Sequence, residues 1–170
     1  YDGGGATIVA YNQAAMDFGN GPNVSNACFD CISNSLTFGD DGTDVTITDD
    51  WNTIDIVGHE FTHGVTKFSA GLSYINESGA LNESFSDIFG EMVELFTNGT
   101  ADWLVGADRG AIRSISNPSS FSTGYGGNMP DTYLGPNWYT GSSDVGGVHH
   151  NSSVQNFWFF LLANGGSGTN

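Results

Sequence analysis

Basic residues are nearly absent from this chain of 170 residues, which carries three lysines and arginines against 19 aspartates and glutamates and a formal net charge of −16. A surface this acidic repels phosphate backbones and anionic membrane surfaces, so we expect neither nucleic acid nor a membrane among its partners. The aromatic content of 13% can supply a buried core, which argues against disorder. The composition therefore predicts one folded domain of at most two lobes and fits a secreted protein. We also expect a monomer.

Long apolar runs are also missing. The longest, FWFFLLA at 157–163, falls well short of the roughly 20 residues that a membrane span needs, and it suits a core helix instead. The chain begins at Tyr1 with no visible signal peptide, so either a leader has been removed or the sequence is a piece of a longer protein. Several Asn-x-Ser/Thr sequons fall inside the stretches that carry the chemistry described below, where a glycan would obstruct. This favours a bacterial, extracellular protein that is processed from a precursor.

Cysteine is equally scarce, because Cys28 and Cys31 are the only two and form a C-x-x-C. A zinc knuckle needs two further ligands nearby, and the surrounding sequence offers none. A redox pair should open a helix after a strand, whereas ACFDCISNS is typical of a loop. A local disulfide is the favoured interpretation, two free thiols the next, and redox chemistry the last.

Turn residues divide the first fifty residues into short β-branched and aromatic runs, which predict strands. From Thr53 the apolar spacing becomes helical and continues until Gly71. A second helix is predicted over 78–96, with an apolar stripe expected to face the core, and a third over 151–163. Residues 99–148 are rich in glycine, serine and asparagine and predict an ordered functional loop region. The predicted strands are 6–11, 35–41 and 44–50, and the stripe is Leu81, Phe85, Ile88, Met92 and Phe96.

The main chemical signal is HEFTH at 59–63, an H-E-x-x-H motif. At about 100° per residue, His59 and His63 lie one helical turn apart, so both imidazoles can reach one ion. Glu60 points off that axis, where it can reach a water at the metal and act as a general base. The alternative interpretation is an amphipathic helix with two exposed histidines.

A catalytic zinc site needs a third protein ligand. The extended motif with a third histidine is absent, because Thr66 and Ser69 occupy its glycine and histidine positions. Glu83 and Asp87 lie one turn apart beside the apolar stripe of the second predicted helix, so we expect both to face inward. Buried carboxylates need partners, which a metal and its imidazoles would supply. The alternative, a solvated helix face, suits Glu91 better.

With these residues in view, the sequence resembles the thermolysin-like neutral zinc metallopeptidase family, which includes pseudolysin. The resemblance covers nearly the whole chain, as the central portion of the family's catalytic domain. It implies an α+β fold, in which a β-rich lobe over 1–70 ends in the HExxH helix and a mainly helical lobe over 71–170 carries the third zinc ligand and the oxyanion residues. An active-site cleft would lie between them. Family members continue further, so we expect the second lobe to be incomplete. The matching segments are 26–27, 55–66, 70–91, 101–106, 112–118 and 144–153.

The resemblance implies a role for each part of a zinc site. One catalytic zinc ion would be held by the two motif histidines and Glu83, and Glu60 would deprotonate the attacking water. The far nitrogens of the imidazoles would be supported by carboxylate and amide groups of the second helix. The pairs would be Asp87 with His59 and Asn82 with His63.

Oxyanion stabilisation is implied for two further residues. Tyr74 matches the tyrosine that donates to the tetrahedral intermediate, with a core aromatic as the alternative. His149 matches the imidazole that donates beside it, and Asp144 would orient that ring and favour its protonated form. His150 has no role in the pattern. We expect a structural residue at a helix start, with substrate contact as the less favoured alternative. Replacing it should have little effect on turnover or zinc content.

Substrate contacts follow from the same resemblance. Arg113 would bind the carbonyl just past the scissile bond, with a structural ion pair as the alternative. Asn26 and Ala27 would bind the substrate backbone by strand addition. An apolar pocket would accept the residue after the cleaved bond, which implies cleavage of peptides on the amino side of bulky hydrophobic residues. The stretch 26–42 is longer than its family equivalent, which leaves specificity for residues before the scissile bond open. The pocket residues would be Ile56, Val105 and Ile112.

An acidic group resembles the pseudolysin-type calcium site, and oxygen ligands from two helices and a loop suit Ca²⁺. Leu104 and Ala107 stand where thermolysin has further carboxylates, so one structural ion is expected rather than two. The alternative is a solvated acidic cluster. The acidic residues of 40–50 are expected in solvated loops. The ligands would be Asp55, Glu91, Glu94, Asp102 and the backbone carbonyl of Leu104.

Two functional hypotheses follow. The leading one is a secreted zinc endopeptidase that hydrolyses peptide bonds with Glu60 as general base. The other is a non-catalytic module that binds calcium and zinc on the same fold. The second predicts loss of a catalytic residue, and the sequence has lost none of those that the family pattern requires.

Overall fold

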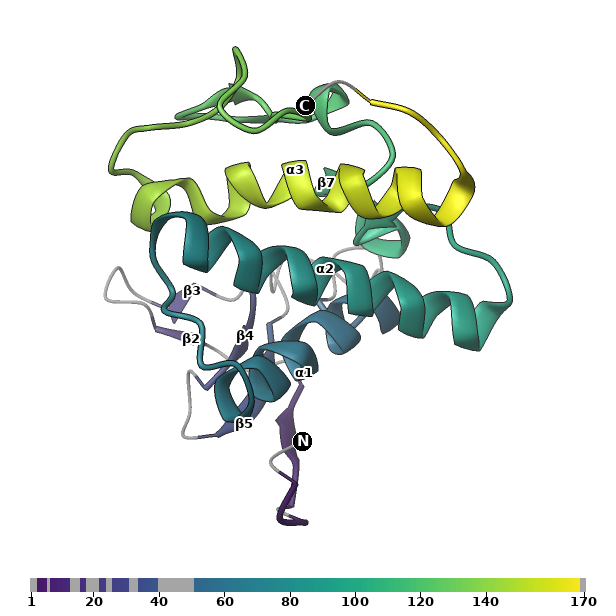
Figure 1. Cartoon of the computed structure of the whole chain (residues 1–170). Helices are drawn as coiled ribbons and strands as arrows, with labels where there is room; N and C mark the ends of the chain where they lie inside the picture. Colours follow the sequence, from purple (N-terminus) through teal and green to yellow (C-terminus); the bar gives the residue numbers. More distant parts are fainter. Residues whose placement is uncertain are drawn as a thin grey trace.

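The computed structural model describes residues 3–5, 7–12, 16–17, 22–23, 26–30, 34–39 and 51–168. The architecture is α+β, as expected, with three long helices and several small sheets. Figure 1 shows helices α2 and α3 side by side, with α1 against the other side of α2 and the strands beyond α1.

Helix α1, Ile54–Phe68, carries the HEFTH motif. Its start agrees with the helical spacing that begins at Thr53, which is the extended N-cap residue. Asp55 in the first turn and Lys67 in the last suit the helix dipole. Gly58 lets a neighbouring helix approach closely, because a Cβ there would lie 2.9 Å from the Cα of Gly90. The close approach brings the motif histidines against the second helix.

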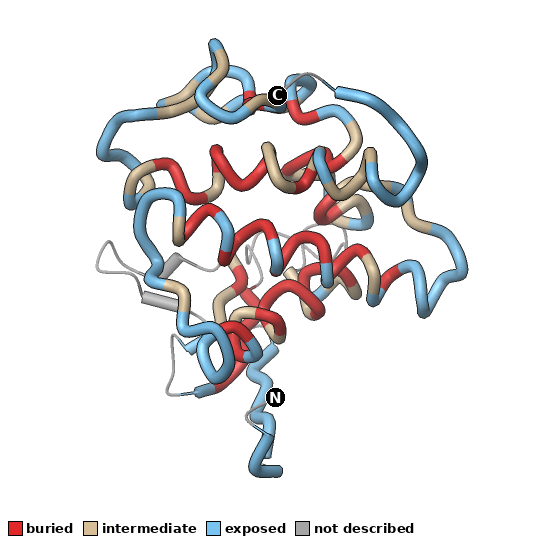
Figure 2. The backbone as a smooth tube through the Cα atoms, viewed as in Figure 1, coloured by how far each residue is buried: buried red, intermediate tan, exposed pale blue. Residues whose placement is uncertain are grey.

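Helix α2, Asn76–Asn98, extends two residues beyond each predicted end. Gly99 ends it with a left-handed φ of 78° and donates its N–H to the Leu95 carbonyl. Its apolar stripe was expected to face the core, and that prediction was wrong. Leu81 and Phe85 are more than a third exposed and Phe96 is 92% exposed. Figure 2 shows buried and exposed positions alternating along this helix.

The buried face of α2 is built from small and polar residues, including glycines, serines and carboxylates. The physical reason is that α1 and α3 pack against the polar face of α2. Its carboxylates and amides form hydrogen bonds and ion pairs with side chains of the neighbouring segments, and its glycines and serines permit close packing. Ile88, the one member of the stripe that is buried, is 5% exposed. An apolar periodicity therefore located the helix without identifying its inward face.

Helix α3, Asp144–Asn164, was predicted to begin only at Asn151. Its first residues have left-handed backbone angles, with φ of 51° at Asp144, 52° at Val145, 92° at Gly146 and 79° at Gly147. A β-branched residue such as Val145 seldom adopts such an angle. A tight left-handed turn thus precedes the regular helix and turns the Asp144 side chain back toward it.

Three strands form the sheet nearest α1, in the order β1-β5-β4. β1 (Val9–Tyr11) runs parallel to β5 (Ser35–Phe38), and β4 (Ala27–Phe29) runs antiparallel to β5. The strands predicted over 6–11 and 35–41 are present in part, and the one predicted over 44–50 lies outside the described residues. A core cluster joins this sheet to α1. Its members are Ala27, Leu36, Phe38 and Ile56.

The cysteine segment was expected to be a loop, whereas β4 runs through Ala27–Phe29, because its backbone pairs with β5. Cys28 is disulfide-bonded. Cys31, the only other cysteine in the sequence, lies outside the described residues.

The segment between α2 and α3 contains short elements and no long helix, as expected for an ordered loop region. The elements are β6 (Leu104–Val105) paired with β7 (Arg113–Ser114), η2 (Ala107–Arg109), η3 (Pro118–Ser120), and β8 (Ser122–Thr123) paired with β9 (Gly127–Asn128). The later part of the segment, from η3 onward, lies over α3 in Figure 1, whereas β6 contacts α2. A further two-stranded sheet pairs β2 (Met16–Asp17) with β3 (Pro22–Asn23).

Candidate active site

Three ligand atoms from α1 and α2 converge beside the sheet. His59, His63 and Glu83 each offer one donor atom, and these atoms all lie within 4.8 Å of one another. The two imidazole Nε2 atoms are 3.0 Å apart, close to the roughly 3.3 Å expected for two nitrogens bound tetrahedrally to one zinc ion. Glu83 Oε1 lies 3.3 Å from His63 Nε2, and Oε2 lies 3.6 Å from His59 Nε2. The cluster can hold a metal ion.

The opposite nitrogen of each ring is held by α2. His59 Nδ1 lies 2.9 Å from Asp87 Oδ1, and His63 Nδ1 lies 2.8 Å from Asn82 Oδ1. Both oxygens accept, so each Nδ1 carries its proton and donates. Each Nε2 then presents a lone pair to the other, an arrangement that is repulsive unless a proton or a cation lies between them.

Glu83 is fully buried, and its Oε2 has no hydrogen-bond partner. Burial alone would raise the pKa of this carboxyl, but the charge of His149 and the hydrogen bond and charge of His63 hold it well below its usual range. In turn, burial opposes protonation of His63, and the Glu83 carboxylate nevertheless raises the His63 pKa to about 9. A buried, ionised carboxylate with an oxygen that accepts no hydrogen bond suits a cation ligand.

Asp87 links the cluster to the rest of the protein. Its carboxylate accepts from His59 and takes a bidentate pair from Arg113, with Nε to Oδ2 at 2.9 Å and Nη2 to Oδ1 at 2.7 Å. Asn156 of α3 donates to Oδ2 at 2.8 Å. Burial opposes the charge, but Arg113 and His59 lower the Asp87 pKa to about 2. The structural ion pair that we considered for Arg113 is therefore present, and Arg113 also lines the cleft described below.

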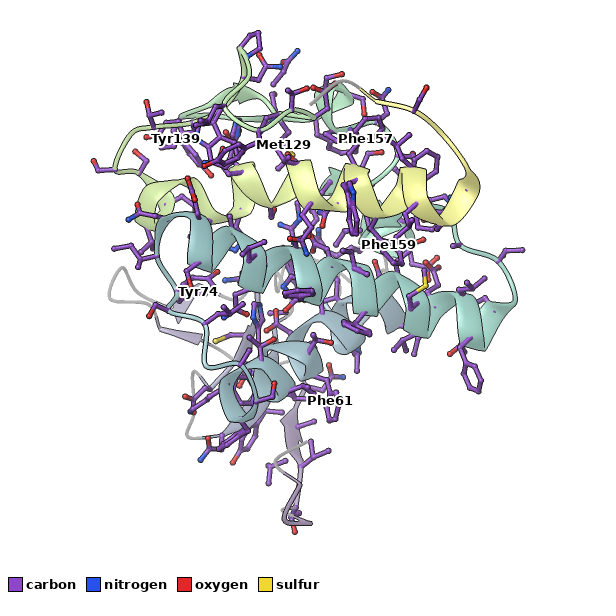
Figure 3. All side chains as sticks on the ribbon, in the orientation of Figure 1. Phe61, Tyr74, Met129, Tyr139, Phe157 and Phe159 are labelled. Atoms are coloured by element: carbon purple, nitrogen blue, oxygen red, sulfur yellow. The ribbon has the colours of Figure 1, made fainter. Side chains whose placement is uncertain are left out.

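Tyr74 lies between Glu83 and His149, beside the start of α2 (Figure 3). Its hydroxyl donates a short hydrogen bond to Glu83 Oε1 and lies 3.2 Å from His149 Nε2. The residue is 42% exposed, so the alternative of a core aromatic is wrong. Burial of the hydroxyl and the Glu83 charge raise the pKa of Tyr74 above its usual value, so the group remains a proton donor at neutral pH.

Asp144 and His149 form a close pair across the left-handed turn. Asp144 Oδ1 accepts from His149 Nδ1 at 2.6 Å, and Oδ2 accepts from the backbone N–H of His149 at 2.8 Å. Desolvation opposes protonation of His149, but the nearby Glu83 charge and the Asp144 hydrogen bond raise its pKa. His149 Nε2 lies 3.4 Å from Glu83 Oε2, so this ring faces the metal cluster.

A cleft of about 710 Å³ runs past the cluster. Glu60 is buried beside His59 and lines the cleft, as do Asn26 and Ala27. β4 pairs with β5 in the sheet of the described residues, and its residues Ala27, Cys28 and Phe29 line the cleft. The predicted apolar pocket residues line the same space. They are Ile56, Val105 and Ile112.

Glu91, Glu94 and Asp102 bring three carboxylates together at the far end of α2, as a second possible metal site. Burial and mutual repulsion with neighbouring carboxylates raise the pKa of Glu91 and of Glu94 to about 7 each. Asp55 is outside this group of three, and its oxygens accept from the Thr53 hydroxyl and from a backbone N–H. Leu104 adjoins the group through its N–H, which donates to Asp102 Oδ1 at 2.8 Å.

His150 is fully buried, which makes substrate contact impossible and supports the structural interpretation. Its Nε2 lies 2.9 Å from the Asn137 carbonyl and its Nδ1 lies 2.8 Å from Thr123 Oγ1. The sequence supported no prediction for stability, and the structure adds one, because a buried ring with two hydrogen bonds anchors two segments to α3.

Several residues that complete the site escaped the sequence analysis. Asn156 and Ser84 hydrogen-bond each other beneath Asp87, and Tyr125 donates to Asp144. No pattern within a helix or strand indicates such contacts, because each joins residues far apart in the sequence.

The arrangement is that of a metallopeptidase-type site beside a substrate cleft. Two histidines of one helix and a glutamate of the next can bind the metal, and a tyrosine and a histidine face them. Comparisons with known proteins agree with this class. The family model for the catalytic domain of thermolysin metallopeptidase matches residues 1–67, and the model for its alpha-helical domain matches residues 70–170. The chain belongs to the thermolysin metallopeptidase family.

Individual relatives give the same result. Bacillolysin of Bacillus cereus is 47% identical over 154 residues, which are 86% of this chain and 25% of that protein. Thermolysin of Alicyclobacillus acidocaldarius subsp. acidocaldarius is 40% identical over 173 aligned positions, which cover 98% of this chain and 29% of that protein. The solved precursor of protealysin, a metalloproteinase from Serratia proteamaculans, superposes with a TM-score of 0.70 at 33% identity, covering 85% of this chain and 48% of that one.

The chain thus spans about a quarter to three tenths of the length of these curated relatives. Within the described ranges, none of the helices is both long and apolar enough to cross a bilayer.

Proposed function

We propose that this chain carries the catalytic centre of a zinc-dependent endopeptidase. The observation that carries the proposal is the convergence of His59, His63 and Glu83, with two Nε2 lone pairs and a carboxylate oxygen that accepts no hydrogen bond turned toward one point. This set of donors suits zinc, with three protein ligands and one position left for water or substrate. Asp87 and Asn82 would hold the two rings in the binding tautomer.

Zinc bound here would polarise the substrate carbonyl and acidify a water molecule. Glu60, on the cleft wall next to His59, would accept the proton of that water and later deliver it to the leaving amine. Tyr74 and His149 would donate hydrogen bonds to the oxygen that becomes negative. Asp144 would keep the His149 ring oriented and protonated, in agreement with the raised His149 pKa.

Substrates would be proteins or peptides in extended form. Asn26 and Ala27 line the cleft at the start of β4, where they would offer backbone groups for strand addition. The apolar wall of Ile56, Val105 and Ile112 would accept a bulky hydrophobic side chain, so cleavage would fall on its amino side. Arg113 would contact the carbonyl after the scissile bond while remaining paired with Asp87.

One structural calcium ion would bind at Glu91, Glu94 and Asp102, with Asp55 and the Leu104 carbonyl completing its shell. Two buried carboxylate oxygens of Glu91 and Glu94 without hydrogen-bond partners support this proposal, because oxygen atoms of this kind suit Ca²⁺. We further propose the lobe division of 1–70 and 71–170 with the cleft between them, a monomer without nucleic-acid or membrane partners, and a secreted bacterial protein. The net charge of −16 supports the absence of nucleic-acid and membrane partners, because it repels phosphate groups and anionic surfaces.

A peptide-cleavage assay tests the proposal. The zinc-loaded protein should hydrolyse a peptide at the bond on the amino side of a leucine or phenylalanine. A zinc chelator should abolish this activity. Glu60→Gln should bind zinc normally and lose nearly all turnover. If wild type holding one zinc ion cleaves no better than Glu60→Gln, the chain is a non-catalytic metal-binding module instead.

A further inference from the structure

The β8–β9 hairpin carries a tyrosine that reaches the Asp144 and His149 pair from outside the active-site segment. The Tyr125 hydroxyl donates to Asp144 Oδ2 at 2.6 Å. The same oxygen accepts from the backbone N–H of His149, while the other carboxylate oxygen accepts from its ring. Within the described part of the chain, Tyr125 supplies the one hydrogen bond to this carboxylate that does not come from the turn itself.

The hairpin is fixed by its own contacts. The N–H of Gly126 donates to Thr123 Oγ1 at 3.0 Å, and Thr123 Oγ1 lies 2.8 Å from His150 Nδ1. His150 Nε2 faces the Asn137 carbonyl, which can only accept, so the proton is on Nε2 and the Thr123 hydroxyl donates to Nδ1. A side chain at Gly126 would meet the His150 ring at 2.6 Å. The hairpin tip, and with it Tyr125, is thereby held against α3.

Aromatic packing completes the arrangement. The Tyr125 ring lies 5.0 Å from the Tyr139 ring and 6.0 Å from that of His150, measured between centroids. Tyr139, which Figure 3 places by the start of α3, is held at its backbone N–H and carbonyl by the Asn151 side chain. Its hydroxyl accepts from the N–H of Ser143. The tyrosine pair therefore joins the hairpin to the start of the left-handed turn, at Ser143 and Asp144, and to the helix that follows it, at Asn151.

The turn has need of such support. Asp144 and Val145 both have left-handed backbone angles that residues with side chains adopt at a cost. Asp144 begins this turn, and the other two hydrogen bonds of its carboxylate both come from His149, the residue that it orients. A hydrogen bond from a hydroxyl on an anchored ring sets the carboxylate plane, and the plane sets the direction of the His149 ring.

We propose that Tyr125 is a positioning residue for His149, acting through Asp144, a role that rests on the proposed peptidase function. Tyr125 is neither one of the three candidate metal ligands nor one of the residues that line the cleft. It fixes the Asp144 carboxylate so that His149 Nε2 points at the place where the oxyanion forms. Loss of the hydroxyl should thus weaken transition-state stabilisation while leaving substrate binding and the zinc ligands unchanged.

The test is the variant Tyr125→Phe, which keeps the ring and removes the hydroxyl. We expect kcat to fall about three- to tenfold, the equivalent of one hydrogen bond, with KM and zinc content unchanged. Tyr133→Phe is the matched control, because it removes a hydroxyl that donates at 2.9 Å to Glu77, another carboxylate on the surface. Its kcat should equal that of wild type. Thermal unfolding of both variants checks that the fold is kept.

A double-mutant cycle separates positioning from general destabilisation. In an Asp144→Ala background, Tyr125→Phe should have no further effect on kcat, because the carboxylate through which Tyr125 acts on His149 has been removed. An equal fall in both backgrounds, or a change in KM alone, would overturn the proposal.

A second readout does not depend on activity. The proton on His149 Nδ1, assigned by its loss in His149→Ala, should shift upfield and exchange faster with water in Tyr125→Phe, and should be unaffected in Tyr133→Phe. An unchanged signal would overturn the proposal. If wild type cleaves no peptide, the peptidase function fails, and this signal alone decides whether Tyr125 positions His149.

Discussion

Gly58 on α1 and Gly90 on α2 lie so close that a Cβ on Gly58 would come within 2.9 Å of the Gly90 Cα. The same Cβ would come within 3.2 Å of Val93 Cβ. This contact lies one residue from His59, so the distance between the helices also sets the distance between the imidazoles and Glu83. Glycine at both Gly58 and Gly90 is therefore required for the three candidate ligands to come together.

Gly58→Ala should lower the free energy of unfolding by about 1–3 kcal/mol, because the helices must separate to admit the methyl group. Zinc affinity should fall with it. Denaturant titration and a competitive zinc chelator measure the two effects. Gly124→Ala is the control, since nothing lies within 4 Å of its Cβ position, and it should change stability by less than about 0.5 kcal/mol. Equal effects of the two variants would show that the contact is unimportant.

Asp87→Ala should be more damaging, because it leaves the buried Arg113 without its bidentate partner. A loss of about 3–5 kcal/mol in the free energy of unfolding is expected for an uncompensated buried charge. Where the variant remains folded, zinc affinity should fall about 10- to 100-fold, because His59 loses the group that orients it. Asp131→Asn, a change at an exposed carboxylate bonded to the adjacent Thr132, is the control and should leave both quantities near wild type.

The two adjacent histidines should respond in opposite ways. His149→Ala should lower kcat about 100- to 1,000-fold with zinc content and melting temperature unchanged, since it removes an oxyanion donor. His150→Ala should lower the melting temperature, because it removes a fully buried ring that holds Thr123 and Asn137. Steady-state kinetics and calorimetry distinguish them. A catalytic loss without destabilisation in His150→Ala would contradict the structural role.

The acidic cluster should make stability depend on pH in the calcium-free protein. The pKa values of Glu91 and Glu94 are raised from 4.5 to about 7, so the folded state binds protons more tightly than the unfolded state. The stabilisation by these protons is full below about pH 4.5 and is lost as the pH rises through 7. Calcium should replace the protons and restore stability at neutral pH.

Thermal unfolding between pH 5 and 8, with and without calcium, measures this effect. Without calcium the contribution of the cluster to the melting temperature should fall across this range, and added calcium should raise the melting temperature more at pH 8 than at pH 5. Glu91→Gln should reduce both the pH dependence and the response to calcium. A calcium response that is the same at both pH values would exclude the cluster as the site.

The candidate ligand cluster could be predicted from sequence because its parts lie on helices. The spacing of His59 and His63, and of Glu83 and Asp87, follows from the local period of the helix, which needs no knowledge of other segments. Family resemblance then supplied the partners that local spacing cannot, such as Asp144 for His149. The structure brings all of these residues together.

Local patterns failed where burial depends on what packs against an element. The apolar stripe of α2 predicted an inward face, yet that helix buries its serines, glycines and carboxylates against α1 and α3. The periodicity of a helix shows only that its two faces differ in polarity. Which face is buried depends on the elements that pack against it, here α1 and α3. The left-handed turn before α3 was missed for a similar reason, since its angles are held by distant contacts.

The sequence by itself determined which groups can bind a metal, their order on two helices, and the acidity that limits possible partners, because these depend on residue type and short-range spacing. Tertiary structure alone decided which face of α2 is buried, that His150 is an anchor, and that Tyr125 reaches Asp144. Those contacts join residues 13 to 28 positions apart, and their free energy is gained only when the packed helices bring the segments together.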